Sequence, residues 1–290
     1  MPPYVETKKS SLIHDQLNKE RGNIMEKIRV KDIEIAYSIS GEGDPVILIG
    51  GFTMTKESWG LQVAEMSKRF RVITFDNRGA GQTTITSESF TVADMAADTI
   101  GIMDALGIDS AHIFGVSMGG LISQILVLDY PDRIKKAVLG CTTHGGRHAV
   151  QAEREVMALL GEAADPAIPA EKAVRSRVPI LFAEQFIRDE PERLEEFIRL
   201  SIRHWPTPEG ASGQMRALSV FNSKRRLGEI RRPVLIITGS EDRMMPPENS
   251  RLLADAIPGS DLYIVDEAGH SFYQEKPDEV NRVLIDFFMK

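Results

Sequence analysis

A serine flanked by glycines is the first feature of the sequence that could carry covalent chemistry. Residues 115–119 read Gly-Val-Ser-Met-Gly, directly after a strand-like apolar run and directly before a stretch with helical spacing that starts near Leu121. A serine on so sharp a strand-to-helix turn needs a glycine two positions away on each side, because larger side chains would collide. The helix N-terminus also favours negative charge near the hydroxyl. The pattern predicts Ser117 as a nucleophile. The alternative, an ordinary glycine-rich loop, leaves the residues described next unexplained.

A serine hydroxyl needs a positioned base at neutral pH, and histidine is the commonest one. The chain has six histidines, and only His270 follows a late strand-like run, at residues 262–265. A loop at the C-terminal edge of a parallel sheet would carry His270 toward the serine. We therefore predict His270 as the base. The other histidines are His14 in the polar N-terminal stretch, His112 in the strand before the serine, and His144, His148 and His204 in a helical segment.

A histidine that acts as a base is oriented, and stabilised as the imidazolium, by a carboxylate. Glu241 and Asp242 both follow the strand-like residues 234–237. Asp242 gives the chain order serine, acid, histidine that is expected of such a site, and we favour it over Glu241 on motif grounds. Glu241 remains the alternative. The strand that ends at Cys141 is followed by two threonines and offers no acid.

Two backbone N–H groups should stabilise the oxyanion of a tetrahedral intermediate. One is expected from Met118, the residue after the nucleophile, and the other from the loop after the strand-like residues 46–49. Gly50-Gly51-Phe52 occupies that loop, and the Phe52 N–H is the predicted second donor.

Alternation of strands and helices explains how these loops could meet. Residues 46–141 alternate between β-branched apolar runs and helical stretches, which is typical of a parallel sheet built from βαβ units. A preceding hairpin is predicted over residues 27–40. Residues 144–226 have helical periodicity without a convincing strand, and the strand pattern returns at Pro233. We expect a polar N-terminal tail (1–26), an α/β core (27–143 and 227–290) and a helical insertion (144–226).

The motifs, taken in order, resemble those of the α/β-hydrolase superfamily from about Ile28 to the C-terminus. The resemblance implies an α/β fold with a mostly parallel eight-stranded sheet flanked by helices, and a helical cap formed by the insertion. The chain is most similar to capped enzymes that include 3-oxoadipate enol-lactonases and small esterases. It departs from the common pattern at Gly50 and Val116, where histidine is frequent. The matching segments are Gly50-Gly51-Phe52, Asp76-Asn77-Arg78-Gly79, Gly115-Val116-Ser117-Met118-Gly119, Gly239-Ser240-Glu241-Asp242 and Gly269-His270.

A pocket roofed by the insertion would need apolar walls. Gly51, Met244 and Phe272 flank the presumed catalytic loops and are predicted to line it. Phe182 and Trp205, inside the insertion, are further candidates. The alternative is that these aromatic side chains only pack helices onto the core. The turn at Asp76-Asn77-Arg78-Gly79 is interpreted as structural and not as part of the site.

Composition excludes several classes of function. The chain has 290 residues, a net charge of −7 and one cysteine. The acidic balance disfavours nucleic acid, and a single cysteine excludes an internal disulfide or a cysteine-rich metal site. No metal-ligand spacing or phosphate-binding loop is present, so neither a metal nor a cofactor is expected. No apolar run reaches the roughly 18 residues of a membrane span, so we expect a soluble cytoplasmic protein. Met25 is an alternative start.

The hypothesis with most support is a serine hydrolase that cleaves a small carboxylic ester or lactone through an acyl-enzyme on Ser117. Hydrolysis of a carbon–carbon bond and cofactor-free perhydrolysis are alternatives that use the same residues. A non-catalytic protein that binds or senses a ligand in the cavity is an alternative from another class, because a fold alone does not define an activity.

Overall fold

The computed structural model describes residues 26–87, 89–163 and 168–290, and its centre is one eight-stranded sheet. The strand order is β1-β2-β4-β3-β5-β6-β7-β8. β2 pairs antiparallel with β1 and β4, and the remaining neighbours are parallel. The predicted α/β fold, with a mostly parallel sheet of eight strands, is confirmed. The strands are β1 (Glu26–Val30), β2 (Ile33–Ser40), β3 (Asp44–Ile49), β4 (Phe70–Phe75), β5 (Ala111–Val116), β6 (Ile134–Gly140), β7 (Val234–Gly239) and β8 (Asp261–Val265).

Helices cover both faces of the sheet. Side chains of α3, α4 and α10 pack into one core cluster, and those of α2, α11 and α12 pack into a second cluster on the other face. The bounds of these helices are α2 (Gly60–Met66), α3 (Val92–Ala105), α4 (Met118–Asp129), α10 (Pro247–Ala256), α11 (Phe272–Glu275) and α12 (Pro277–Met289), with 3₁₀ turns η1 (Lys56–Trp59), η2 (Pro131–Arg133) and η3 (Leu227–Glu229).

The unbroken apolar run of β3 is explained by burial on both faces. Ile47 and Ile49 belong to the first core cluster, whereas Val46 and Leu48 belong to the second. All four side chains are fully buried. Removing each from water contributes about 1.5–3 kcal/mol. β3 is therefore a firmly held support for the loop that follows it.

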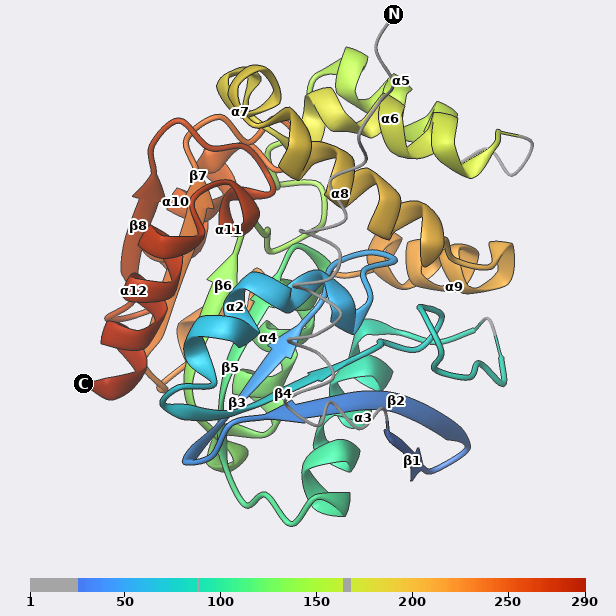
Figure 1. Ribbon diagram of the computed structural model, residues 1–290. Helices are drawn as coiled ribbons and strands as arrows, with labels where there is room; N and C mark the ends of the chain where they lie inside the picture. The colour runs from blue at the N-terminus through green and yellow to red at the C-terminus, as the bar shows by residue number, and fades with distance from the viewer. Residues whose placement is uncertain (1–25, 88, 164–167) are drawn as a thin grey trace, which may run out of the picture.

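Five further helices of the described chain are inserted between β6 and β7. Val174, Val178 and Phe182 of this region pack with Leu194 and Ile198 in a hydrophobic cluster separate from the two core clusters. Figure 1 shows the insertion on one side of the molecule, with the arrows of β6 and β8 pointing toward it. The helices are α5 (Arg154–Ala163), α6 (Ala170–Leu181), α7 (Glu184–Asp189), α8 (Pro191–Arg203) and α9 (Pro208–Ser219).

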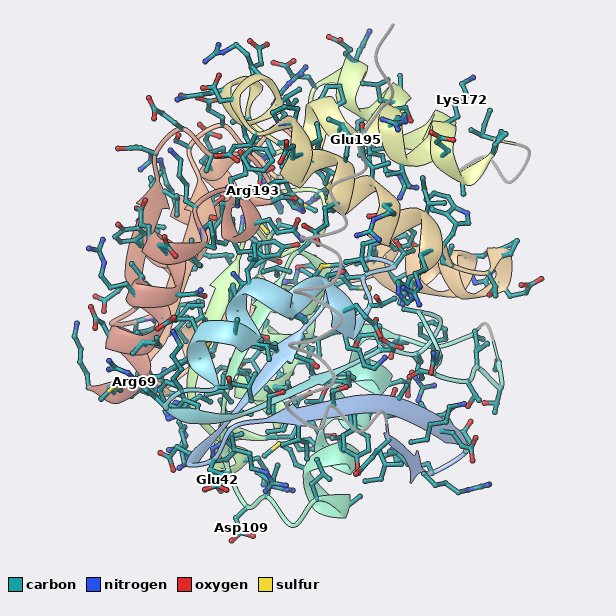
Figure 2. All side chains as sticks on the ribbon, in the orientation of Figure 1. Glu42, Arg69, Asp109, Lys172, Arg193 and Glu195 are labelled. Atoms are coloured by element: carbon teal, nitrogen blue, oxygen red, sulfur yellow. The ribbon has the colours of Figure 1, made fainter. Side chains whose placement is uncertain are left out.

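The helical insertion lies at the end of the sheet where the parallel strands terminate. Glu42 and Asp109, which precede β3 and β5, lie at the opposite end of the molecule from Lys172 of α6 and from Arg193 and Glu195 of α8 (Figure 2). The loops that follow the parallel strands are therefore on the side of the insertion.

Two local differences from the sequence predictions matter for the site. Helix α4 begins at Met118 rather than near Leu121, because the Ser117 carbonyl already accepts the N–H groups of Gly120 and Leu121. The short helix α11 was not predicted. The predicted hairpin is confirmed as β1 and β2. The predicted tail, including His14, lies outside the described residues, except that Glu26 begins β1.

Among the described residues, no helix is both long enough and apolar enough to cross a bilayer.

Candidate active site

Ser117 occupies a strained turn between β5 and α4. Its backbone has φ 55° and ψ −116°, which costs on the order of 1–3 kcal/mol for a residue with a side chain. Two hydrogen bonds to neighbouring segments hold it there: its N–H donates to Gly140 O at 2.8 Å, and its carbonyl accepts the Thr142 hydroxyl at 2.8 Å. The surrounding structure therefore imposes a conformation that Ser117 would not adopt alone.

This turn requires glycine at positions 115 and 119, because neither position has room for a Cβ atom. A Cβ added to Gly119 would collide with the carbonyl oxygen of Ile49, and one added to Gly115 would collide with the carbonyl oxygen of Gly119. Both obstacles are backbone atoms of regular elements, so they cannot move aside cheaply. Backbone packing explains the glycine spacing.

His270 and Asp242 come together at the ends of β8 and β7. His270 Nδ1 lies 2.8 Å from Asp242 Oδ2, and both side chains are buried. Asp242 Oδ1 accepts the N–H groups of Met244 and Met245 at 2.9 and 2.8 Å. An ionised carboxylate can only accept, so Nδ1 carries the proton and Nε2 of the neutral ring is left to act as a base. Glu241, the alternative acid, is exposed and does not form this bond.

The charge of Asp242 changes the acidity of His270. Burial lowers the pKa of the His270 imidazolium, but the Asp242 carboxylate and the Cys141 side chain together raise it by more, so the pKa lies above the ordinary histidine value. Water cannot solvate the protonated ring at this buried position, but a carboxylate at hydrogen-bond distance stabilises it.

Cys141, at the end of β6, lies against the same histidine. Its thiol is fully buried, and burial raises its pKa. The thiol interacts with the His270 ring and with the Ser117 backbone, so it lies between the two loops. Cys141, Asp242 and His270 are also the one cluster of three metal-ligating side chains in the described part of the chain. Asp242 is hydrogen-bonded to His270, and the raised pKa keeps the Cys141 thiol protonated at neutral pH. Interactions among the three side chains therefore explain why they lie together.

The loop after β3 passes directly beside the serine. A Cβ added to Gly51 would lie 3.3 Å from Ser117 Cβ. Asn77 Nδ2 donates to Gly50 O at 3.0 Å, which ties the loop to the turn after β4. Within the described residues, no hydrogen bond engages the N–H of Phe52 or of Met118. Their role as oxyanion donors stays a prediction that this placement favours.

The predicted pocket residues occupy different environments. Phe182 stacks on Phe186 with ring centroids 5.1 Å apart, and Trp205 borders the same cluster of the insertion. Phe272 is fully buried in the second core cluster, so its ring fills the core rather than facing open space. Met244 is half-buried beside Asp242. Packing within the insertion explains the burial of Phe182, and packing in the core explains that of Phe272. The pocket role of Phe182, Trp205, Met244 and Phe272 stays a prediction.

The arrangement of these loops corresponds to that of a known family. A family model described as the alpha/beta hydrolase fold matches residues 44–277, most of the chain. The chain belongs to the alpha/beta hydrolase fold family. The family inferred from the motifs is thereby confirmed.

Relatives within the alpha/beta hydrolase family have several different reactions in their names. RutD of Azorhizobium caulinodans, named as a carbamate hydrolase, is 27% identical over 88% of this chain and 95% of its own. BpoC of Mycobacterium tuberculosis strain CDC 1551, named as a non-heme bromoperoxidase, is 33% identical over 88% of this chain and 98% of its own. The enol-lactonase structure from Burkholderia xenovorans LB400 has a TM-score of 0.81 at 26% identity and covers 91% of this chain and 100% of its own. The reaction must therefore be argued from the site.

Sequence reasoning missed Glu275 in this hydrolase-fold chain. Its buried carboxylate accepts the N–H of Gly269, next to His270, at 2.8 Å. The other oxygen accepts the N–H of Ala183, between α6 and α7 of the insertion, at 3.0 Å. The Ser271 N–H in turn donates to Leu181 O at 2.8 Å. Glu275 therefore links the His270 loop to the insertion. The only sequence signal was an acidic residue two positions after the apolar pair Phe272-Tyr273.

Arg193 of α8 strengthens the same contact, because its guanidinium donates to the Gln274 carbonyl at the end of α11. Burial raises the pKa of Glu275 to about 7, although the two N–H groups that it accepts oppose the shift. The carboxylate is thus held between the two parts of the structure at a cost in desolvation.

We expect Asp242→Asn to lower kcat about 10⁴-fold without unfolding the protein. The amide oxygen would face the Met244 and Met245 N–H groups, so its NH₂ would face Nδ1 and stabilise the wrong tautomer of His270. Removing the carboxylate also lowers the pKa of His270, so the acid limb of any residual activity should move to lower pH. Steady-state kinetics across pH, with circular dichroism as the folding check, measure this. Glu241→Gln is the matched control; an equal loss in that variant would contradict the assignment of Asp242.

Replacing Glu275 should change how stability depends on pH. The pKa of Glu275 in the folded protein, about 7, exceeds its ordinary value of 4.5, so protonated Glu275 favours the folded state. This contribution to stability is present at low pH and is lost as pH rises through 7. Gln does not titrate. The difference in free energy of unfolding, Glu275→Gln minus wild type, should therefore increase by about 2–3 kcal/mol from pH 5 to pH 8. Urea unfolding of both proteins in the same buffers measures the difference, and a value independent of pH would refute it.

Proposed function

We propose that this protein hydrolyses small carboxylic esters or lactones through an acyl-enzyme on Ser117. The observation that carries the proposal is the 2.8 Å bond between His270 and Asp242 at the sheet edge where Ser117 occupies its strained turn. A buried carboxylate, a ring whose Nε2 is unprotonated and a serine at a helix N-terminus are the three parts that acyl transfer needs.

In the proposed first step, Ser117 Oγ attacks the substrate carbonyl carbon and its proton passes to His270 Nε2. The negative charge on the former carbonyl oxygen is stabilised by the N–H groups of Phe52 and Met118. His270 then protonates the leaving oxygen as the ester bond breaks. Asp242 stabilises the imidazolium throughout and is not itself protonated.

In the second step, water takes the place of the alcohol. His270 accepts a proton from the water as its oxygen attacks the acyl carbon, and the proton then returns to Ser117 as the acyl bond to serine breaks. With a lactone, the leaving oxygen stays attached to the acyl chain, so one hydroxy acid is the product. The likeness to the Burkholderia enol-lactonase supports a lactone as one substrate class.

We further propose that the helical insertion acts as a cap over the site. The contacts of Ala183 and Leu181 with the His270 loop support this role, because they place the insertion directly against a catalytic loop. Excluding water strengthens the electrostatic interactions inside such a site.

Perhydrolysis is a second candidate, favoured by the likeness to BpoC. Hydrogen peroxide would replace water as the attacking group, and a peracid and free serine would result. The same acyl-enzyme serves both reactions, so product analysis in the presence of peroxide separates them.

We expect Ser117→Ala to abolish turnover of a short p-nitrophenyl ester and labelling by a fluorophosphonate probe, while the protein stays folded. The physical reason is that the proposed acyl-enzyme forms on the Ser117 hydroxyl, which alanine lacks. Ser219→Ala, an exposed serine on α9, is the control and should label as the wild type does. Labelling that persists in Ser117→Ala would remove Ser117 from the mechanism.

A further inference from the structure

We propose that Gln214, a buried glutamine of the insertion, is a positioning residue that holds the predicted oxyanion loop in its working shape. The inference rests on the proposed function, because it concerns the N–H of Phe52 in that reaction. It adds that the second oxyanion donor is correctly aimed only when α9 is docked on the core.

The direction of the Phe52 N–H depends on a tight turn over residues 51–54. The Met54 N–H donates to Gly51 O at 3.1 Å and closes the turn. Gly51 O and the Phe52 N–H belong to the same peptide unit and point in opposite directions when that unit is trans. As long as the turn is closed, the Phe52 N–H is therefore directed away from Met54.

Thr53 strains this turn. It has φ 58° at the third position, where type II turns need a positive φ and normally use glycine. For a β-branched residue this conformation is a genuine outlier, at a cost of about 1–3 kcal/mol. Something outside the turn must compensate for the strain.

Gln214 supplies the compensation. Its Oε1 accepts the Thr53 N–H at 2.8 Å, and its Nε2 donates to Arg78 O at 2.9 Å. The side chain is fully buried, so water does not replace these bonds when they are lost. A residue 161 positions further along the chain thus fixes the orientation of the peptide unit between Phe52 and Thr53.

The docking of α9 leaves Gln214 little freedom. A Cβ on Gly210 would collide with Gly79 O, and Gly79 itself has φ 81°, so the start of α9 and the turn after β4 touch backbone to backbone. The Thr207 hydroxyl caps the helix by accepting the Gly210 N–H at 3.2 Å. The glutamine therefore approaches the loop from a helix whose first turn is fixed against the core.

If Gln214 had a purely structural role, replacing it would lower the stability of the protein and leave the shape of the turn unchanged. The test separates the two roles by comparing Gln214→Leu with Gln62→Leu. Gln62 is also fully buried and donates to Tyr273 O at 2.7 Å, but Gln62 itself forms no hydrogen bond with the backbone of residues 51–54.

We expect Gln214→Leu to lower kcat for a p-nitrophenyl ester by about 10- to 100-fold, with KM changed less than threefold. Loss of a whole oxyanion donor costs about 10²–10³-fold, and a misdirected one costs less. Binding of a trifluoromethyl ketone, whose adduct with the serine carries an oxyanion, should weaken by the same factor. Gln62→Leu should lower stability without this loss. A Gln214→Leu enzyme with wild-type kcat and wild-type affinity for the ketone would overturn the proposal.

Thr53→Gly should rescue the Gln214→Leu enzyme, because glycine adopts positive φ about as readily as negative φ. At least half of the lost kcat, on a logarithmic scale, should return. A structural role for Gln214 alone predicts no rescue, and absence of rescue contradicts the proposal.

Hydrogen exchange at the Met54 amide tests the turn without using activity. Its acceptor, Gly51 O, is not touched by either substitution, so its protection reports closure of the turn itself. Protection should fall in Gln214→Leu and stay in Gln62→Leu. Unchanged protection in Gln214→Leu overturns the inference even if the wild type hydrolyses esters. Conversely, a fluorophosphonate that does not label the wild type refutes the proposed function, while the exchange result still decides the role of Gln214.

Discussion

The backbone of Ser117 stays at φ 55° because the elements around it leave no lower-energy arrangement. Gly119 lies against the carbonyl of Ile49, and the Ser117 N–H is bound to Gly140 on the neighbouring strand. These are contacts between regular elements of the core, whose burial provides far more stabilisation than the few kcal/mol of strain. The serine can be presented above the sheet because β3, β5, β6 and α4 are packed backbone to backbone beneath it.

Buried carboxylates extend this support to His270, the proposed base. Asp242 is bound to one imidazole and to two backbone N–H groups, which keeps its charge in place despite burial. Glu275 is bound to two N–H groups on different parts of the fold, and the raised pKa shows that these bonds do not fully offset its desolvation. The two acids therefore contribute differently: Asp242 adjusts the chemistry of His270, and Glu275 fixes the loop that carries it.

Buried side chains link both loops beside the serine to the helical insertion. Gln214 bridges from α9 to Thr53, and Glu275 bridges from the His270 loop to Ala183. A movement of the insertion would thus act on both the predicted oxyanion donor and the base. Such coupling needs no long pathway, because each link is one hydrogen bond long.

The sequence by itself determined the α/β fold, the motif serine and a chain order of serine, acid and histidine, because strand periodicity and glycine spacing are local properties of the chain. It left Glu241 open beside Asp242, and only the folded loop exposed one and buried the other against His270. Gln214 and Glu275 carry no local pattern. Their partners Thr53 and Ala183 lie 161 and 92 residues away. Only tertiary packing, which excludes water and brings the insertion against the core, turns two ordinary polar residues into connections between the insertion and the loops.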